Sequence, residues 1–306
     1  MALAEEESDC EMYCIQPITI QVPVKGIKAF QDLEVPCGKC IGCRIAKRKE
    51  WSLRMLHELT YHPQSSFITL TYDDYHLPSD NSLKKRHLQL FIKRLRKNLG
   101  ERRIKYFACG EYGGQTMRPH YHAILFGSGL TREDKNRVID CWPLCDWTNP
   151  SIKKNSFGIA EPDSIRYVAQ YIDKKFTGDM ADEIYVNQGI EPVFRLLSQG
   201  IGLQYALDNK SQIEELSYIT LKGVKHSVPR YYIKKLDLDV EKLRELALVN
   251  DCEKNEHYSG VNISTDDALR SLNPELIHSI YDGELRSRKQ KKRNLEAKVM
   301  LKQSKL

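Results

Sequence analysis

The sequence predicts an α+β protein in which a central antiparallel sheet is flanked by helices and preceded by an N-terminal cysteine knuckle. Three observations lead to this fold class. Residues 104–111 and 120–126 both have the composition of strands, and the glycine turn between them predicts an antiparallel pair. Residues 67–72, FITLTY, are β-branched and aromatic, which is typical of a third strand. Residues 82–99 repeat apolar side chains at helical spacing.

Composition and charge indicate a globular chain with basic regions. Of the 306 residues 41% are hydrophobic, which is enough for a packed core, and 47 Lys and Arg outnumber 41 Asp and Glu. The N-terminus is acidic, whereas cations gather in residues 84–105 and 286–293. No apolar run approaches the ~20 residues of a membrane span, and the start lacks a basic and then apolar signal pattern. We therefore expect a protein that does not enter a membrane.

The cysteine knuckle is the three cysteines of VPCGKCIGCR, Cys37, Cys40 and Cys43. Nine cysteines, an odd number, in a chain without a secretion signal argue against a disulfide framework. Two overlapping CxxC pairs with glycines between them predict a structural zinc site, with Cys14 or Cys10 as the fourth ligand. The alternative is three reduced thiols near a helix start. An iron–sulfur cubane is disfavoured because no cysteine follows Cys43 at ferredoxin spacing.

Two helices are predicted on either side of the FITLTY strand. The first covers 44–61, with Trp51, Met55 and Leu59 on one face. The second covers 82–99, with Ser82 as its cap and Gly100 at its end. Its outer face carries seven cations and no acid, a pattern that favours phosphate backbones over simple solubility. These candidate DNA-binding residues are Lys84, Lys85, Arg86, Lys93, Arg94, Arg96 and Lys97.

A candidate metal site lies on the predicted strand pair. His120 and His122 are two residues apart, so both point to one face of their strand. Glu111, on the antiparallel neighbour, is expected to face them. Two imidazoles and one carboxylate can bind a divalent metal, here Mg²⁺ or Mn²⁺, and leave other positions open for a phosphate. An isolated HxH is more often a chance feature of a half-buried strand, and the upstream Glu111 argues against that alternative.

The predicted helix at 164–175 presents two tyrosines. Tyr167, Tyr171 and Lys174 fall at i, i+4 and i+7 and share one face. The simpler interpretation is that the tyrosines close the edge of a core. However, Lys174 is placed to stabilise a phenolate or a leaving oxygen, and a metal with a phenol can transesterify a phosphodiester. We therefore consider Tyr167, Tyr171 and Lys174 candidate catalytic residues.

The rest of the chain carries weaker signals. Residues 128–161 contain Trp142 and Trp147 and are expected to form an ordered insertion that ends in a strand near Phe157. Residues 194–207 and 218–232 are expected to form a helix and short strands. Beyond residue 246 the chain is polar, with six cations between Arg286 and Arg293. No GxxxxGK loop is present, so an ATPase activity of its own is not expected.

Several of these motifs resemble a known family. GEYGG and RPHYHAILFG resemble the HUH signature of rolling-circle replication initiators, and YVAQYIDKK resembles their two-tyrosine helix. The resemblance is closest to the replication-associated proteins of gokushoviruses, small single-stranded DNA phages of the Microviridae that include Chlamydia phages. It extends over VPCGKCIGCR, FITLTY, LQLFIKRLRK and PRYYIKK and so covers roughly residues 14–235.

The resemblance implies a site-specific single-strand endonuclease on an HUH-type sheet. Such a protein nicks an origin, forms a 5′-phosphotyrosine, frees a 3′-OH primer and later rejoins the displaced strand. It implies viral origin DNA as substrate, host helicase and polymerase as partners, and the bacterial host cytoplasm as location. On this basis we expect an N-terminal segment at 1–62, an HUH endonuclease domain at 63–180, an accessory DNA-contacting region at 181–245 and a polar basic tail with partial disorder at 246–306.

Two other functions are compatible with the sequence. One is a non-catalytic, zinc-containing origin-binding protein in which the tyrosines belong to the core. The other is a related HUH transposase or relaxase that uses the same chemistry for strand transfer. The order of Glu111, the histidines and both tyrosines argues against the first alternative. The cysteine knuckle and PRYY favour the phage initiator over the second by resemblance alone.

Overall fold

The computed structural model describes residues 14, 16–23, 29–172, 185–243, 245 and 246. The chain divides into two compact units, residues 47–208 and a second unit made of residues 1–46 with 209–306. The candidate residues Lys174 and Cys10 and the basic tail lie outside the described residues, as does most of the acidic N-terminus. None of the helices in the described ranges is both long and apolar enough to cross a bilayer.

A five-stranded sheet forms the centre of the unit at residues 47–208, and its strand order is β6-β3-β5-β4-β7. Every neighbouring pair is antiparallel. The strands are β3 (Ser65–Leu70), β4 (Lys105–Tyr112), β5 (Pro119–Phe126), β6 (Phe157–Ile159) and β7 (Arg195–Leu197). The antiparallel sheet predicted from the sequence is thus confirmed, with β5, the strand of the two histidines, in the middle.

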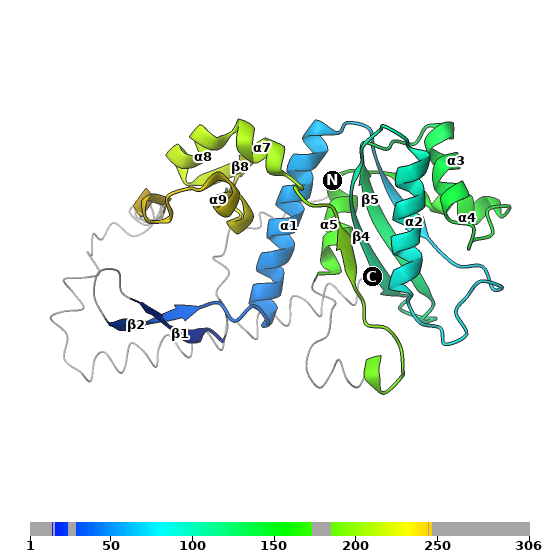
Figure 1. Cartoon of the computed structure of the whole chain (residues 1–306), viewed down its shortest axis with the longest axis horizontal. Helices are drawn as coiled ribbons and strands as arrows, with labels where there is room; N and C mark the ends of the chain where they lie inside the picture. Colours follow the sequence, from blue (N-terminus) through cyan, green and yellow to red (C-terminus); the bar gives the residue numbers. More distant parts are fainter. Residues whose placement is uncertain (1–13, 15, 24–28, 173–184, 244, 247–306) are drawn as a thin grey trace, which may run out of the picture. The chain divides into compact units, whose positions relative to one another are not determined.

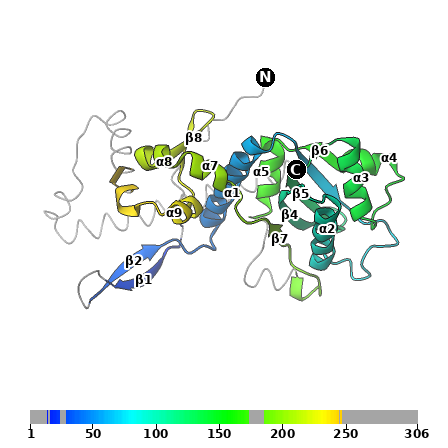
Figure 2. The ribbon, with the colours of Figure 1, turned by 45° about the horizontal axis from the view of Figure 1, so that its top comes forward.

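Helices cover both faces of this sheet (Figures 1 and 2). On one face α2 (Lys85–Asn98) and α3 (Arg132–Cys141) pack against Ile68, Tyr121 and Ala123 around the fully buried Trp142. On the other face α5 (Pro162–Gln170) and the later turns of α1 (Ile41–Tyr61) pack against Phe107, Ile124 and Phe126. Because strand residues alternate between faces, the histidines of β5 lie on the α5 side.

The predicted helices are present with shifted ends. Helix α1 begins at Ile41 rather than at residue 44, so Cys43 lies in its first turn. Helix α2 begins at Lys85, and the predicted cap at Ser82 is wrong. The Ser82 hydroxyl is instead buried, where it accepts a hydrogen bond from the Glu191 N–H at 2.7 Å. Gly100 ends α2 with a φ of 62°, a left-handed conformation that glycine adopts at little cost.

The insertion between β5 and α5 is ordered as predicted and contains α3 and α4 (Pro150–Asn155), which we did not predict. Thr131 caps α3, and the Asn149 side chain caps α4. The unit also ends in a helix, α7 (Leu203–Asp208). All of these elements are drawn in green to yellow-green in Figure 1.

The second unit holds two hairpins and short helices. Strands β1 (Ile18–Pro23) and β2 (Phe30–Val35) form an antiparallel pair that the sequence analysis missed. Strands β8 (Tyr218–Leu221) and β9 (Val224–Ser227) form another. Helices α8 (Lys210–Leu216) and α9 (Arg230–Leu236) flank β8 and β9 along the chain. The PRYY segment forms the start of α9, where Tyr232 is fully buried.

Candidate active site

The candidate active site is built on the register between β4 and β5. The hairpin is closed by the N–H of Gly113, which donates to the carbonyl of Arg118 at 3.0 Å. This turn pairs Glu111 directly with His120 and Cys109 with His122. All three candidate metal ligands therefore project from the same face, at the end of the sheet where the hairpin turns.

The three candidate ligands are in mutual contact. Glu111 Oε2 lies 3.3 Å from His120 Nε2 and 3.4 Å from His122 Nε2. One donor atom from each residue lies within 4.8 Å of the others, which is close enough for one metal ion. The His120 and Glu111 side chains retain 20% and 14% of their exposure, so a substrate could reach an ion held between them.

Both imidazoles are oriented through their other ring nitrogen. His120 Nδ1 lies 3.1 Å from the carbonyl oxygen of Arg118, and His122 Nδ1 lies 3.0 Å from Thr69 Oγ1. A partner on Nδ1 is the usual outer contact of a metal-binding histidine because it fixes the ring and leaves Nε2 for the ion. The donor set and its outer contacts therefore fit a divalent metal.

Two aromatic rings enclose His122. Phe67 of β3 and Tyr171 stack on it with ring centroids 5.5 Å away in each case and interplanar angles of 15° and 11°. His122 is only 5% exposed as a result. Thr69 and Phe67 were not predicted as site residues individually. The signal was available, because β3 pairs Thr69 with His122 and places Phe67 on the same face.

The two tyrosines come from the C-terminal half of α5. The helix is shorter than predicted and begins two residues earlier, with Pro162 at its first position and the Glu161 N–H donating to Ser164 Oγ at 2.8 Å. Tyr167 lies within the helix and Tyr171 is its C-cap. Their rings are 5.3 Å apart and nearly perpendicular. Both rings contact His122, so the structure brings both tyrosines to the candidate metal ligands.

The two phenols differ in environment. The hydroxyl of Tyr167 lies 3.5 Å from His122 Nε2, and its ring is only partly buried. Tyr171 is 7% exposed. Burial raises the pKa of the Tyr171 hydroxyl far above its ordinary value, and its contacts with Glu111 and Tyr167 raise that pKa further. Tyr167 is therefore the more accessible nucleophile and Tyr171 the more protected one.

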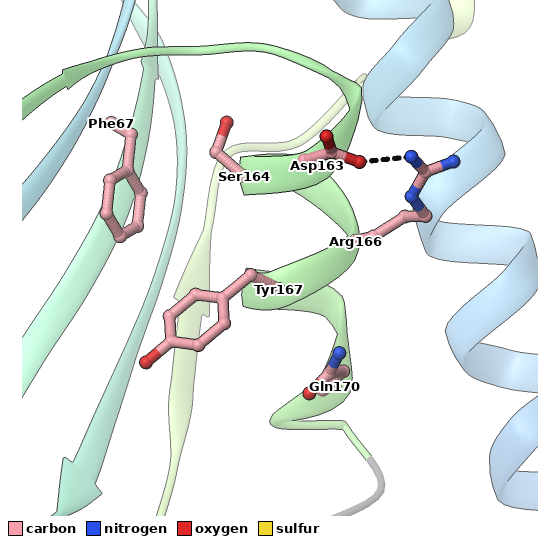
Figure 3. A pocket seen from close by; sticks show the side chains of 6 residues that line it. All are labelled: Phe67, Asp163, Ser164, Arg166, Tyr167 and Gln170. Atoms are coloured by element: carbon pink, nitrogen blue, oxygen red, sulfur yellow. Dashed lines mark hydrogen bonds and ion pairs between the residues drawn. The ribbon is translucent and has the colours of Figure 1, made fainter. Parts of the chain in front are cut away.

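An open pocket of about 580 Å³ adjoins Tyr167. Figure 3 shows the Tyr167 ring and Phe67 on one side of it, while Arg166 extends to the other side of α5 and pairs with Asp163. The Phe67 and Tyr167 rings meet edge to face, with centroids 6.0 Å apart. The remaining lining residues are Ser164 and Gln170. A substrate in this pocket would meet the Tyr167 side chain directly.

The candidate DNA-binding residues of α2 and the residue before it lie away from these side chains. Lys85, Arg86, Lys93, Arg94 and Lys97 are exposed. The Lys84 ammonium pairs with Asp80 at 2.6 Å, which reduces its availability to a phosphate. The Arg96 guanidinium lies over the Tyr106 ring at 5.2 Å and donates to Ser198 Oγ. Since α2 covers the face opposite α5, the basic helix and the histidines are on opposite faces of the sheet.

The candidate zinc ligands form a separate cluster in the other unit. Cys14, Cys37, Cys40 and Cys43 have their sulfur atoms within 4.8 Å of one another, so they too could hold a metal ion. The described residues thus contain two groups of candidate metal ligands with different chemistry. One has imidazole and carboxylate donors, and the other has only thiols.

Comparison with known proteins identifies the family. Residues 65–176, which contain the histidines, Glu111 and both tyrosines, match the model of the replication-associated protein ORF2 family. No solved structure matches the chain.

Three curated relatives are similar over most of the chain. The replication-associated protein ORF2 of Spiroplasma virus 4 is 35% identical over 66% of this chain and 68% of its own length. The replication-associated protein VP4 of Bdellovibrio phage phiMH2K is 32% identical over 72% and 76%, respectively. The replication-associated protein ORF4 of Chlamydia phage 1 is 31% identical over 67% of this chain and 54% of its own length. The chain therefore belongs to the family of phage replication-associated proteins.

Proposed function

We propose that this protein initiates rolling-circle replication of a phage genome by nicking one DNA strand in a metal-dependent transesterification. One observation carries the proposal. The Tyr167 hydroxyl lies 3.5 Å from His122 Nε2, and that nitrogen lies 3.4 Å from Glu111 at the edge of an open pocket. A nucleophile beside a divalent-metal donor set is the arrangement that phosphodiester transesterification requires.

Glu111, His120 and His122 would hold the catalytic ion, Mg²⁺ or Mn²⁺. Such an ion, when bound, would supply positive charge to a nonbridging oxygen of the scissile phosphate. The protein's own contribution is orientation. Thr69 and the Arg118 carbonyl fix the two imidazoles, and the stacked rings of Phe67 and Tyr171 exclude water from one side of His122. The two carboxylate contacts keep Glu111 directed at both histidines.

In the proposed reaction the Tyr167 oxygen attacks the phosphorus at the nick site. The new bond joins the tyrosine oxygen to the 5′-phosphate, and the bond between phosphorus and the 3′ oxygen breaks. The phenol loses one proton and the departing 3′ oxygen gains one, so the reaction is balanced without water or ATP. The phosphotyrosine retains the energy of the original ester, so a strand end can later be rejoined.

Tyr171 is proposed to act in the second cleavage. After one round of copying, Tyr167 is still esterified, so a new cleavage of the regenerated origin needs another hydroxyl. Tyr171 lies one helical turn away and contacts the same histidine. Because its hydroxyl is buried and its pKa is raised, we infer that a local shift of the end of α5 precedes its attack. Lys174, which lies outside the described residues, remains a candidate for stabilising the leaving oxygen.

The substrate and partners follow from the same proposal. The pocket beside Phe67 and Tyr167 suits a single-stranded nucleotide, because aromatic faces stack on bases of any sequence. The exposed cations of α2 suit the phosphates of origin DNA. The free 3′-OH would be extended by the host's polymerase while the host's helicase separates the strands, in the cytoplasm of the bacterial host.

A nicking assay tests this proposal. Supercoiled DNA that carries the phage origin should be converted to an open circle with Mg²⁺ or Mn²⁺ and remain intact with excess chelator. We expect His120→Ala to lower the nicking rate by at least ~100-fold because it removes a ligand of the ion, while DNA binding is retained. His226→Ala, in the other unit, is the matched control and should nick normally. Nicking by His120→Ala at the wild-type rate and metal dependence would exclude this metal site.

A further inference from the structure

The four-cysteine cluster connects three elements of the unit made of residues 1–46 and 209–306. Cys14 precedes β1, Cys37 follows β2, and Cys40 immediately precedes α1. Cys43 lies in the first turn of that helix. The hairpin's first residue pair is Ile18 with Val35, so the cluster lies at the base of the β1–β2 hairpin, where the two strands are closest to α1 in sequence.

The sulfur positions fit a tetrahedral ion. With zinc–sulfur bonds of about 2.3 Å, two sulfurs of a tetrahedral site are about 3.8 Å apart. Cys14 Sγ and Cys40 Sγ are 3.8 Å apart, and the four sulfurs lie within 4.8 Å of one another. A separation of 3.8 Å is far too long for a disulfide bond. It is also shorter than a four-iron cluster would impose, because each cysteine of such a cluster binds a different iron.

The backbone around the sulfurs is arranged to stabilise thiolates. The N–H groups of Lys39 and Cys40 donate to Cys37 Sγ at 3.4 and 3.3 Å, and the N–H of Cys37 donates to Cys14 Sγ at 3.1 Å. Gly38 makes this fold-back with a φ of 72°, a conformation that a side chain would strain. Backbone donors directed at sulfur partly compensate the negative charge that four thiolates would bring together.

We propose that Cys14, Cys37, Cys40 and Cys43 bind one structural zinc ion, which joins the β1–β2 hairpin to the start of α1. This site is chemically distinct from the proposed catalytic site, which has no sulfur ligand and is built in the other unit. All four positions are taken by protein thiolates, so no coordination position is left for a substrate and the site is structural rather than catalytic.

The hairpin itself shows why an ion is needed there. Nearly all of its described residues are exposed, including Phe30 at 70% and Ile18 at 50%. A two-stranded hairpin with so little burial is marginally stable in water. A zinc ion at its base would contribute free energy that the sparse packing does not, because the ligands are brought together only in the folded state. We therefore expect the ion to control the order of the hairpin and not the chemistry at Tyr167.

Metal analysis of the full-length protein, purified without chelator, tests the proposal first. We expect about one zinc ion per chain after dialysis, and loss of most of it in the double variant Cys37→Ser, Cys40→Ser. The control is Cys141→Ala, which removes a buried thiol elsewhere and should keep the zinc. Wild-type protein without zinc, with iron and sulfide, or with a Cys14–Cys40 disulfide found by mass spectrometry would overturn the proposal, as would zinc retained by the double variant.

A second measurement is independent of whether the double variant folds. Lys39 is exposed between two of the ligands, so trypsin can report on the knuckle directly. In wild-type protein, removal of zinc should speed cleavage after Lys39 by at least ~10-fold, and adding zinc back should reverse this, whereas cleavage after Lys153 in the other unit should not change. Equal cleavage rates at Lys39 with and without zinc would contradict the structural role. Because the readout is proteolysis at the knuckle, it is separate from any failure of the nicking assay.

Discussion

His122 is the most constrained side chain of the candidate site. It contacts Thr69 through one nitrogen, Glu111 and Tyr167 through the other, and aromatic rings on both faces. The sequence predicted the two histidines and Glu111 because strand alternation and the glycine turn define which residues share a face. It did not predict Thr69 and Phe67, since their role depends on the pairing of β3 with β5, which is a contact between residues distant in sequence.

The contact between Thr69 and His122 gives a prediction for metal affinity. Thr69→Val keeps the side-chain shape but removes the oxygen that lies 3.0 Å from His122 Nδ1. We expect the metal concentration for half-maximal nicking to rise about 10- to 100-fold, with little change in rate at saturating metal. The matched control is Thr71→Val, whose hydroxyl contacts Cys145 instead. An unchanged metal titration would show that this contact does not orient the ligand.

The different burial of the two phenols gives a second prediction. Tyr167→Phe should lower covalent adduct formation with a short origin oligonucleotide by at least ~100-fold, because the accessible nucleophile is removed. Tyr171→Phe should still form the adduct but fail to release unit-length circles in a replication assay. Each change keeps the ring that packs on His122. Equal loss of adduct in both variants, or a reversed order, would contradict the proposed division of roles.

At the scale of elements, the sequence predicted those with a buried face and missed those without one. Strands β3, β4 and β5 and helix α2 have strong apolar patterns because each packs against the central core. The β1–β2 hairpin is exposed on both faces, so no alternation of apolar and polar residues reveals it. Helix α3 has only two buried apolar residues, Val138 and Cys141, and its start depends on a local cap at Thr131.

The start of α3 gives a prediction for stability and pH. Asp134 is 3% exposed, and burial alone would raise the pKa of its carboxyl. The ion pair with Arg102 and the contacts with Thr131 and the Gly129 N–H outweigh burial and hold that pKa below its ordinary value of 3.8. The ionised carboxylate therefore stabilises the fold above the ordinary pKa, and the stabilisation is lost as the pH falls through the lowered pKa.

We accordingly expect Asp134→Asn to lower the free energy of unfolding at pH 7 by about 1–3 kcal/mol, measured by urea denaturation. The difference between variant and wild type should shrink below about pH 4, where the carboxyl begins to be protonated. The exposed Asp163→Asn, whose pairing with Arg166 is at the surface, is the control and should cost less than about 1 kcal/mol. A destabilisation by Asp134→Asn that is independent of pH would show that the charge is not what matters.

At the scale of the sheet, DNA has two separate surfaces to contact. The exposed cations of α2 cover one face, and the candidate active site occupies the other. The sequence could not show this separation, because the basic helix and the histidines are simply close together along the chain. We infer that the α2 face holds the origin duplex, while the strand to be cut passes around the sheet edge to Tyr167.

This separation gives a prediction for DNA binding. Replacing the exposed Lys85, Arg86, Lys93 and Lys97 by Ala should weaken binding to origin duplex and reduce its salt dependence, with the logarithmic slope falling by about 0.9 for each phosphate that is no longer neutralised. Cleavage of a short single-stranded oligonucleotide at saturating concentration should change less than ~3-fold, since no substituted residue touches the site. Lys153→Ala with Lys154→Ala on α4 is the control for the change in net charge. Unchanged duplex binding would remove α2 from the interface.

The central claim is that a tyrosine of α5 becomes covalently joined to DNA. The most direct measurement is mass spectrometry of peptides from the adduct formed between the wild-type protein and a single-stranded origin oligonucleotide with Mn²⁺. We predict a 5′-phosphotyrosine at Tyr167, with Tyr171 modified only in the Tyr167→Phe variant or after a full round of replication, and no adduct in the double Tyr→Phe variant. A nucleotide attached at any other residue, or an adduct that persists in the double variant, would contradict the proposed mechanism.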